Sequence, residues 1–407
     1  MRPYVACLLA CQLLACSERA AVSKPVIRCD VASANAQSPD AFVLAGSDFV
    51  RRARAKSEPD LYRNAEVCAA QALELDPEHA GALRLQGLVL LNDHRFERAR
   101  QLAQRMLAQN PEDTLSWGTL SDANLELGDL AGAIEAAQRM LDIKPNLPGY
   151  GRAAHLRWLQ GDVAGAKRLY ERAIASGSGN KDPEPRAWMI VQAAWLFWHE
   201  GDYRGADAGF ELALRSVRDY APALEGKGRT ALASGDYATA VRWLERAERA
   251  RPSVETSAQL ADAYALAGDR ERAAAVYARL PNEGRHDPRG LALYYATHAL
   301  QPSAALELAR SEYAQRKDLY SKDVLALALW RNGQFAEADR LARQAIAAGT
   351  PDARLLYHAG LIRSAAARDE AGKREGQALM TRALQLNPGF DPILTGERHA
   401  PELAQNR

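Results

Sequence analysis

Residues 114–145 read TLSWGTLSDANLELGDLAGAIEAAQRMLDIKP, and this stretch decides the fold of the chain. Its apolar and small residues recur at intervals of three, four and seven, the spacing that places side chains on one buried face of an α-helix. In the middle of the stretch, Gly128 can adopt the left-handed conformation that ends a helix, and Asp129 can cap the helix that follows. The stretch therefore predicts two helices joined by a short turn and closed by Pro145.

The same arrangement occurs one unit earlier in the chain. Residues of the same kinds fall in register with the first stretch there: Leu83, Gln86, Gly87, Leu90, Ala99, Ala103, Met106 and Pro111. A helix pair of this pattern, with a period of about 34 residues, resembles the tetratricopeptide repeat. The resemblance implies that successive pairs stack into a right-handed superhelix that shares one continuous core.

Further units of the same kind cover nearly all of residues 41–388. The weakest is the eighth, because Pro302 occupies the position of its turn. We therefore expect an all-α fold, a right-handed α-solenoid of about ten tetratricopeptide-like helix pairs. The expected boundaries are an N-terminal repeat block at 41–178, an insertion loop at 179–186, a C-terminal repeat block at 187–388 and a cap or tail at 389–407.

The N-terminal residues 1–16, MRPYVACLLACQLLAC, combine one cation with an apolar run that is too short to span a bilayer. This is the anatomy of a signal peptide. The run Leu-Leu-Ala-Cys that ends at Cys16 resembles a bacterial lipobox, which implies lipidation of Cys16 and makes residues 17–40 a flexible tether. By the same resemblance, Ser17 favours an outer-membrane protein that faces the periplasm. A plain secretion signal and a buried N-terminal helix are the alternatives.

Two cysteines, Cys29 and Cys68, remain after the signal peptide. Disulfides persist in proteins that are exported from the cytoplasm. A bridge between these two cysteines would attach the tether to the first repeat. The alternative is a pair of independent buried thiols.

The balance of charges argues against a nucleic-acid partner. The chain has 52 basic and 51 acidic residues, and removal of residues 1–16 takes away Arg2 and no acid, so 51 of each remain. A neutral chain lacks the basic surface that nucleic-acid binding needs. The sequence also has no HExxH, no GxSxG, no Walker loop and no GxGxxG that opens a helix, and its eight histidines are scattered. We therefore expect no enzyme, no metal site and no small-molecule cofactor.

The resemblance to tetratricopeptide proteins implies that the first helix of each unit lines a concave groove. In the fifth unit, Trp188, Trp195, Trp198 and His199 fall at groove positions, and spacings of seven and three place the three indoles on one helical face. Large rigid aromatic side chains in a groove are typical binding anchors. The alternative is that these rings fill a tight superhelix. Corresponding positions in other units add Arg152, Arg229, Tyr294, His298, Trp330, Arg331 and Tyr357.

These features predict a non-catalytic scaffold that binds a segment of a partner protein in its groove. With a lipid anchor, it would support assembly of a complex of the bacterial envelope, of the pilus, secretion or polysaccharide-export type. One alternative is a lipoprotein that binds carbohydrate or exopolysaccharide, because indole faces stack on sugars. Another is an intracellular adaptor, if the N-terminus is not a signal.

Overall fold

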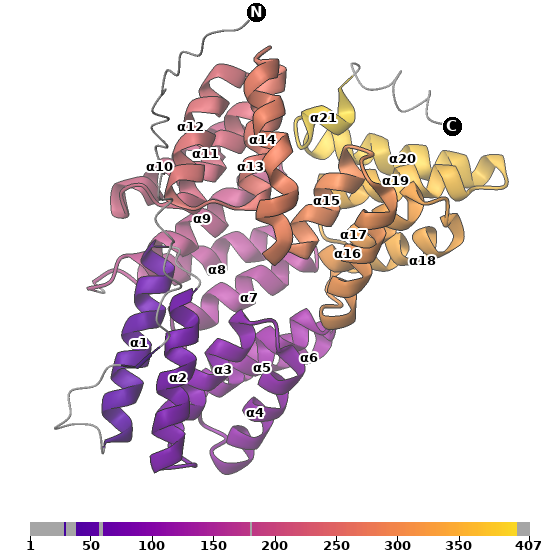
Figure 1. The fold of residues 1–407 in the computed structure, drawn as a ribbon. Helices are drawn as coiled ribbons and strands as arrows, with labels where there is room; N and C mark the ends of the chain where they lie inside the picture. Colours follow the sequence, from indigo (N-terminus) through magenta and orange to yellow (C-terminus); the bar gives the residue numbers. More distant parts are fainter. Residues whose placement is uncertain (1–27, 30–37, 57–59, 180, 397–407) are drawn as a thin grey trace, which may run out of the picture.

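The computed structural model describes residues 28–29, 38–56, 60–179 and 181–396 (Figure 1). Within these residues all regular structure is helical, and twenty helices pair in chain order, from α1 with α2 to α19 with α20. The prediction of an all-α solenoid of about ten helix pairs is confirmed. The helices are α1 (Pro39–Lys56), α2 (Asp60–Leu75), α3 (Ala80–Asn92), α4 (Phe96–Gln109), α5 (Thr114–Glu126), α6 (Leu130–Ile143), α7 (Leu147–Leu159), α8 (Val163–Ser176), α9 (Glu184–His199), α10 (Tyr203–Ser216), α11 (Ala221–Ala233), α12 (Tyr237–Ala250), α13 (Val254–Leu266), α14 (Arg270–Glu283), the short 3₁₀-helix η2 (Gly284–His286), α15 (Pro288–Thr297), α16 (Pro302–Gln315), α17 (Leu319–Arg331), α18 (Phe335–Ile346), α19 (Ala353–Ala366), α20 (Glu370–Leu386) and α21 (Pro392–Thr395).

The turn inside a helix pair follows from two adjacent residues. Gly128 has a φ of +84°, and the carboxylate of Asp129 accepts a hydrogen bond from the Gly132 backbone N–H at 2.9 Å. Each residue satisfies a requirement of the turn, since glycine adopts positive φ without strain and aspartate satisfies a free N–H at the start of a helix. The same aspartate cap recurs at the start of five other second helices, at Asp162, Asp202, Asp236, Asp269 and Asp369.

Two predicted boundaries differ from the structure. Helix α9 begins at Glu184, inside the insertion loop expected at 179–186, because Pro185 lies in its first turn, where no intrahelical N–H is needed. The eighth unit is intact although Pro302 follows its turn. Positive φ at Ala299 and Gln301 supplies the turn that glycine makes elsewhere, and proline then begins α16.

The C-terminal helices return to lie against the N-terminal half of the superhelix (Figure 1). The backbone N–H of Lys317 donates to the carbonyl of Glu126 at 2.7 Å, at the end of α5. The hydroxyl of Thr350 donates to the carbonyl of Leu159 at 2.6 Å, at the end of α7, and these residues are 191 positions apart. We call this set of contacts the seam.

The seam continues at the end of α9. The side-chain amide of Asn387 donates to the carbonyl of Trp198 at 2.7 Å, across 189 positions of sequence. The last carbonyls of a helix have no partner within it, and the seam contacts supply donors to three of them. The Trp198 carbonyl also accepts from the Gly201 N–H at 3.0 Å. The ion pair of Arg316 with Glu126, at 2.6 Å, and the packing of Leu319 and Tyr320 on the α5–α8 core strengthen the same boundary.

The first helix pair is attached to the segment that precedes it. Cys29 and Cys68 form a disulfide with an S–S distance of 2.01 Å, and the Asn64 side chain donates to the Arg28 carbonyl at 2.8 Å. Residues 28–29 are therefore held against α2. The predicted lipidation site Cys16, the signal peptide at 1–16 and most of the predicted tether at 17–40 lie outside the described residues. No helix in the described part of the chain is long and apolar enough to cross a membrane.

Candidate functional site

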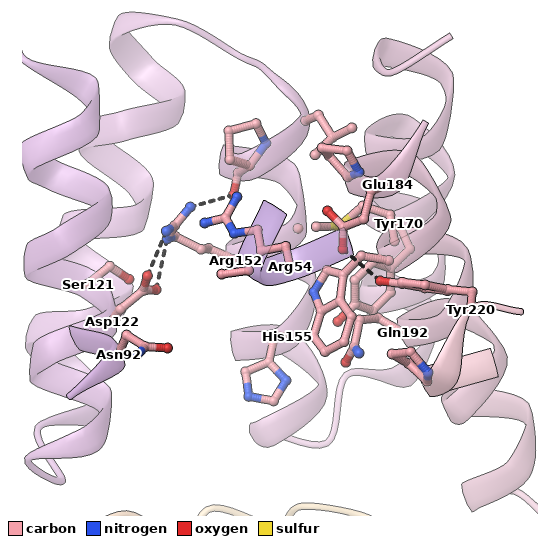
Figure 2. Close-up of a pocket in the computed structure, with 18 of the residues that line it drawn as sticks. Arg54, Asn92, Ser121, Asp122, Arg152, His155, Tyr170, Glu184, Gln192 and Tyr220 are labelled. Carbon is pink, nitrogen blue, oxygen red and sulfur yellow. Dashed lines mark hydrogen bonds and ion pairs between the residues drawn. The ribbon is translucent and has the colours of Figure 1, made fainter. Parts of the chain in front are cut away.

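A groove of about 790 Å³ lies on the concave side of the N-terminal half, and we call it the N-terminal groove (Figure 2). Its walls come from α1, α3, α5, α7 and α9 and from the turns that lead into α11 and α13. Stacked helix pairs build such a surface because the first helix of every pair faces inward. Its volume lies in the range of pockets that hold small molecules or short peptide segments, roughly 300–1,000 Å³.

Both carboxylates that line the N-terminal groove are already engaged (Figure 2). Arg152 binds Asp122 through two hydrogen bonds of 2.8 and 2.6 Å, and also donates to the Pro148 carbonyl. Burial lowers the pKa of Arg152, but the adjacent Asp122 outweighs it, so the pKa lies above its usual value. Glu184 accepts a hydrogen bond of 2.8 Å from the Tyr220 hydroxyl. Arg152 therefore neutralises Asp122, whereas Glu184 keeps its negative charge beside the uncharged Tyr220 hydroxyl.

Two further arginines line the N-terminal groove, Arg54 and Arg251, and both are exposed. Neither has an ion-pair or hydrogen-bond partner for its side chain within the described residues. Figure 2 shows Arg54 in the same part of the groove as the two engaged carboxylates. Burial lowers the pKa of His155, so this ring is neutral at pH 7. The groove therefore presents unneutralised positive charge.

The structure divides the predicted tryptophan trio between two places. Trp188 lines the N-terminal groove and is 40% exposed, the most exposed tryptophan of the described residues. Trp198 is only 3% exposed and packs edge-on against Trp195, with ring centroids 5.5 Å apart. The Arg229 guanidinium lies 4.7 Å from both ring centroids. For Trp195 and Trp198, this arrangement matches the alternative in which the rings fill the superhelix.

The structure also places the other predicted groove residues in different cavities. Arg152 lines the N-terminal groove with Trp188. A second cavity, described below, is lined by His199, Arg229, Tyr294 and His298 together with Trp195 and Trp198.

Trp330 and Arg331 line neither cavity, and Tyr357 packs against Phe390 at a centroid distance of 5.4 Å. Arg331 instead donates to the Ala296 carbonyl at 2.7 Å and so caps α15.

The sequence pattern missed several residues of the N-terminal groove. Arg54 lies near the end of α1, in a degenerate repeat whose register is poorly defined. Arg251 and Tyr220 lie in connections between repeats, outside the positions that the family pattern assigns to the groove. Charged or aromatic residues one to three positions before a first helix are the signal that could have found Tyr220 and Arg251.

Comparison with known proteins agrees with the repeat pattern. Two family models described as tetratricopeptide repeat match the chain, one at residues 50–114, 84–148 and 191–255 and the other at 231–294. The chaperone protein YscY of Yersinia enterocolitica is 38% identical over 72 residues, which is 18% of this chain and 63% of YscY. The probable biofilm formation methyltransferase WspC of Pseudomonas putida is 35% identical over 117 residues, which is 27% of each protein.

The chain spans less than two thirds of the length of each of these relatives. A crystal structure of the APC/C hetero-tetramer Cut9-Hcn1 aligns with a TM-score of 0.49 at 13% identity, over 87% of this chain and 57% of that one. The family matches coincide with helix pairs from α1 to α6 and from α9 to α15. Residues 50–148 and 191–294 of this chain are therefore tetratricopeptide repeats.

Proposed function

We propose that this chain is a protein-interaction scaffold whose N-terminal groove binds an extended, acidic segment of a partner protein. The strongest support is the pair of unpartnered arginines, Arg54 and Arg251, in a groove whose carboxylates are already engaged. Trp188 adds an exposed apolar anchor to the same groove. The partial similarity to a protein named as a chaperone also supports a protein ligand.

A carbohydrate ligand has less support in this fold. Stacking of a sugar needs a free aromatic face, and Arg229 lies over both Trp195 and Trp198. Trp188 is the one member of the trio that keeps substantial exposure. A single exposed indole beside arginines fits a peptide with carboxylates and one apolar side chain better than a glycan.

Binding of defined peptides tests the acidic partner. We expect flexible peptides with one leucine and several aspartates or glutamates to bind the full chain, and matched peptides with lysines to fail, as measured by fluorescence anisotropy. Arg54→Ala and Arg251→Ala should each weaken binding about three- to tenfold, because about 1 kcal/mol is lost with each charge contact. The affinity should fall as salt is added.

Arg98→Ala is the matched control, because Arg98 is equally exposed and unpartnered on α4, away from the groove. Equal binding of acidic and basic peptides, or an Arg98 variant as weak as the groove variants, would contradict the proposal.

We further propose that the chain acts in the bacterial envelope, as a lipoprotein anchored through Cys16. The support is the sequence of residues 1–16, and the bridge of Cys29 to Cys68 is compatible with an oxidising compartment. The partner would then belong to an envelope assembly of the pilus, secretion or polysaccharide-export type. An intracellular adaptor is the competing function.

Metabolic labelling with a palmitate analogue separates these functions. We expect the native chain to be labelled and to sediment with membranes, and Cys16→Ala to lose both properties, because the thiol is the site of acylation. Cys29→Ala should keep the label and serves as the control. An unlabelled chain of full length in the cytoplasm would refute the envelope role, without affecting the peptide-binding result.

A further inference from the structure

The second cavity, of about 350 Å³, lies on the axis of the superhelix in the C-terminal half, and we call it the axial chamber. Six first helices contribute to its wall, α9, α11, α13, α15, α17 and α19. Residues 389–393, which lead into and begin α21, close it on one side. The seam makes this closure possible, because Asn387 holds the following segment against the end of α9. A repeat array without that contact would have an open groove here.

Four side chains of the axial chamber carry buried polar atoms that lack a hydrogen-bond partner. They are Trp198 Nε1, His199 Nδ1, Gln259 Oε1 and Arg354 Nε. The Trp198 side chain is the most enclosed, since the residue is only 3% exposed. Buried polar groups in native proteins are almost always paired. Because all four of these residues line one cavity, we infer that water or a polar ligand occupies it.

Two of the four unsatisfied atoms are obligate hydrogen-bond donors, one is an acceptor, and His199 Nδ1 is either according to its tautomer. Trp198 Nε1 and Arg354 Nε can only donate. Arg289 also lines the chamber, and within the described residues its guanidinium has no ion-pair or hydrogen-bond partner. Gln259 is the exception, because its amide nitrogen donates to Glu255 and its oxygen is left to accept. A ligand that satisfies these atoms needs an acceptor-rich anionic group and at least one donor.

The carboxylates nearest to these atoms do not reach hydrogen-bond distance: Asp352 Oδ2 lies 3.9 Å from His199 Nδ1, and Asp323 Oδ2 lies 3.9 Å from Arg354 Nε. Glu255 pairs with Arg229 at 3.1 Å. Asp262 accepts from the Tyr277 hydroxyl at 2.6 Å and lies 3.1 Å from His298 Nε2, and burial raises its pKa to about 8. The other three carboxylates cap the starts of α15, α19 and α21, and they are Asp287, Asp352 and Asp391.

We propose that the axial chamber binds a small organic acid that carries a hydrogen-bond donor beside its carboxylate, the chemistry shared by α-amino acids and α-hydroxy acids. In this proposal the ligand carboxylate accepts hydrogen bonds from Trp198, Arg354 and Arg289. The adjacent donor of the ligand donates a hydrogen bond to Gln259 Oε1. Leu293, Val324 and Ile393 form an apolar part of the wall and suit an aliphatic side chain. Stacking on an indole face plays no part, because Arg229 lies over Trp195 and Trp198.

Four molecules of nearly equal shape test this chemistry by isothermal titration with the dialysed full chain. L-leucine and leucic acid carry both groups, isocaproate lacks the donor and leucinol lacks the carboxylate. We expect one of the first two to bind, and isocaproate and leucinol to bind at least about tenfold more weakly. Preference for leucine would identify an amino acid, and preference for leucic acid a hydroxy acid. Absence of binding by all four, or equal binding of leucinol, would overturn the proposal and leave a chamber filled by water.

Two matched variants locate the binding. Trp198→Phe removes the donor and keeps most of the ring, so affinity should fall about fivefold or more. Trp158→Phe is the control, because Trp158 Nε1 is also buried without a partner but the residue lines neither the N-terminal groove nor the axial chamber. Arg289→Met should weaken binding about tenfold. Binding that survives both Trp198→Phe and Arg289→Met would place the ligand elsewhere and refute the chamber. Acidic-peptide binding in the N-terminal groove is measured separately and does not depend on this outcome.

Discussion

Replacing Gly128 with alanine is expected to destabilise the chain by about 2 to 5 kcal/mol, through two effects of different origin. The φ of +84° disfavours any residue with a β-carbon, at about 1 to 2 kcal/mol. A β-carbon would also lie 2.6 Å from the carbonyl oxygen of Lys317, a backbone atom that cannot rotate away. The seam must then separate, and the carbonyl of Glu126 loses the hydrogen bond from Lys317.

Gly235→Ala isolates the contribution of the seam. Gly235 has nearly the same φ, +79°, at the equivalent turn, but nothing lies within 4 Å of an added β-carbon. The Gly235→Ala substitution should therefore lower the free energy of unfolding by only about 1 to 2 kcal/mol, the cost of a β-carbon at positive φ. Urea unfolding followed by circular dichroism gives both values, and hydrogen exchange at the Lys317 amide reports the seam directly. If both variants lose the same free energy of unfolding and the Lys317 amide exchanges at an unchanged rate in Gly128→Ala, the two halves of the chain do not depend on this contact.

Replacing Asn387 with alanine is expected to cost about 2 to 4 kcal/mol and to release the segment that closes the axial chamber. Asn387 is completely buried. Its amide donates to the Trp198 carbonyl at 2.7 Å, and its oxygen accepts from the Tyr203 hydroxyl at 2.5 Å and from the Gly389 N–H at 3.2 Å. Truncation removes these three hydrogen bonds, each worth about 0.5 to 1.5 kcal/mol.

Asn110→Ala is the matched control, because Asn110 also follows a second helix and precedes a proline. It is exposed, and its side chain accepts only from the Glu112 N–H. Limited proteolysis should cleave the Asn387 variant near residues 389–396 well before the control, and urea unfolding should show the difference in stability. Similar behaviour of the two variants would show that the segment is held by other contacts.

The candidate site was predictable only in part. Arg152 and Trp188 were placed in the groove from the repeat register, and both line the N-terminal groove. Arg54 and Arg251 were not, because their positions in a degenerate repeat and in a connection carry no family pattern. The seven-and-three spacing of the tryptophans gives a shared helical face, but Trp188 and Trp198 are two to three turns apart on α9 and face different cavities.

The sequence by itself determined the helix pairs, because each depends on residues within about 34 positions: an apolar face, a glycine at positive φ and an aspartate cap. The tertiary structure alone decided how far the superhelix closes. Lys317, Thr350 and Asn387 resemble ordinary residues at the end of a repeat, yet they satisfy helix carbonyls some 190 positions away. Closure depends on small rotations summed over several stacked pairs, and no single stretch of sequence encodes that sum. This closure brings residues 389–393 against the first helices and so adds a wall to the axial chamber that the N-terminal groove lacks.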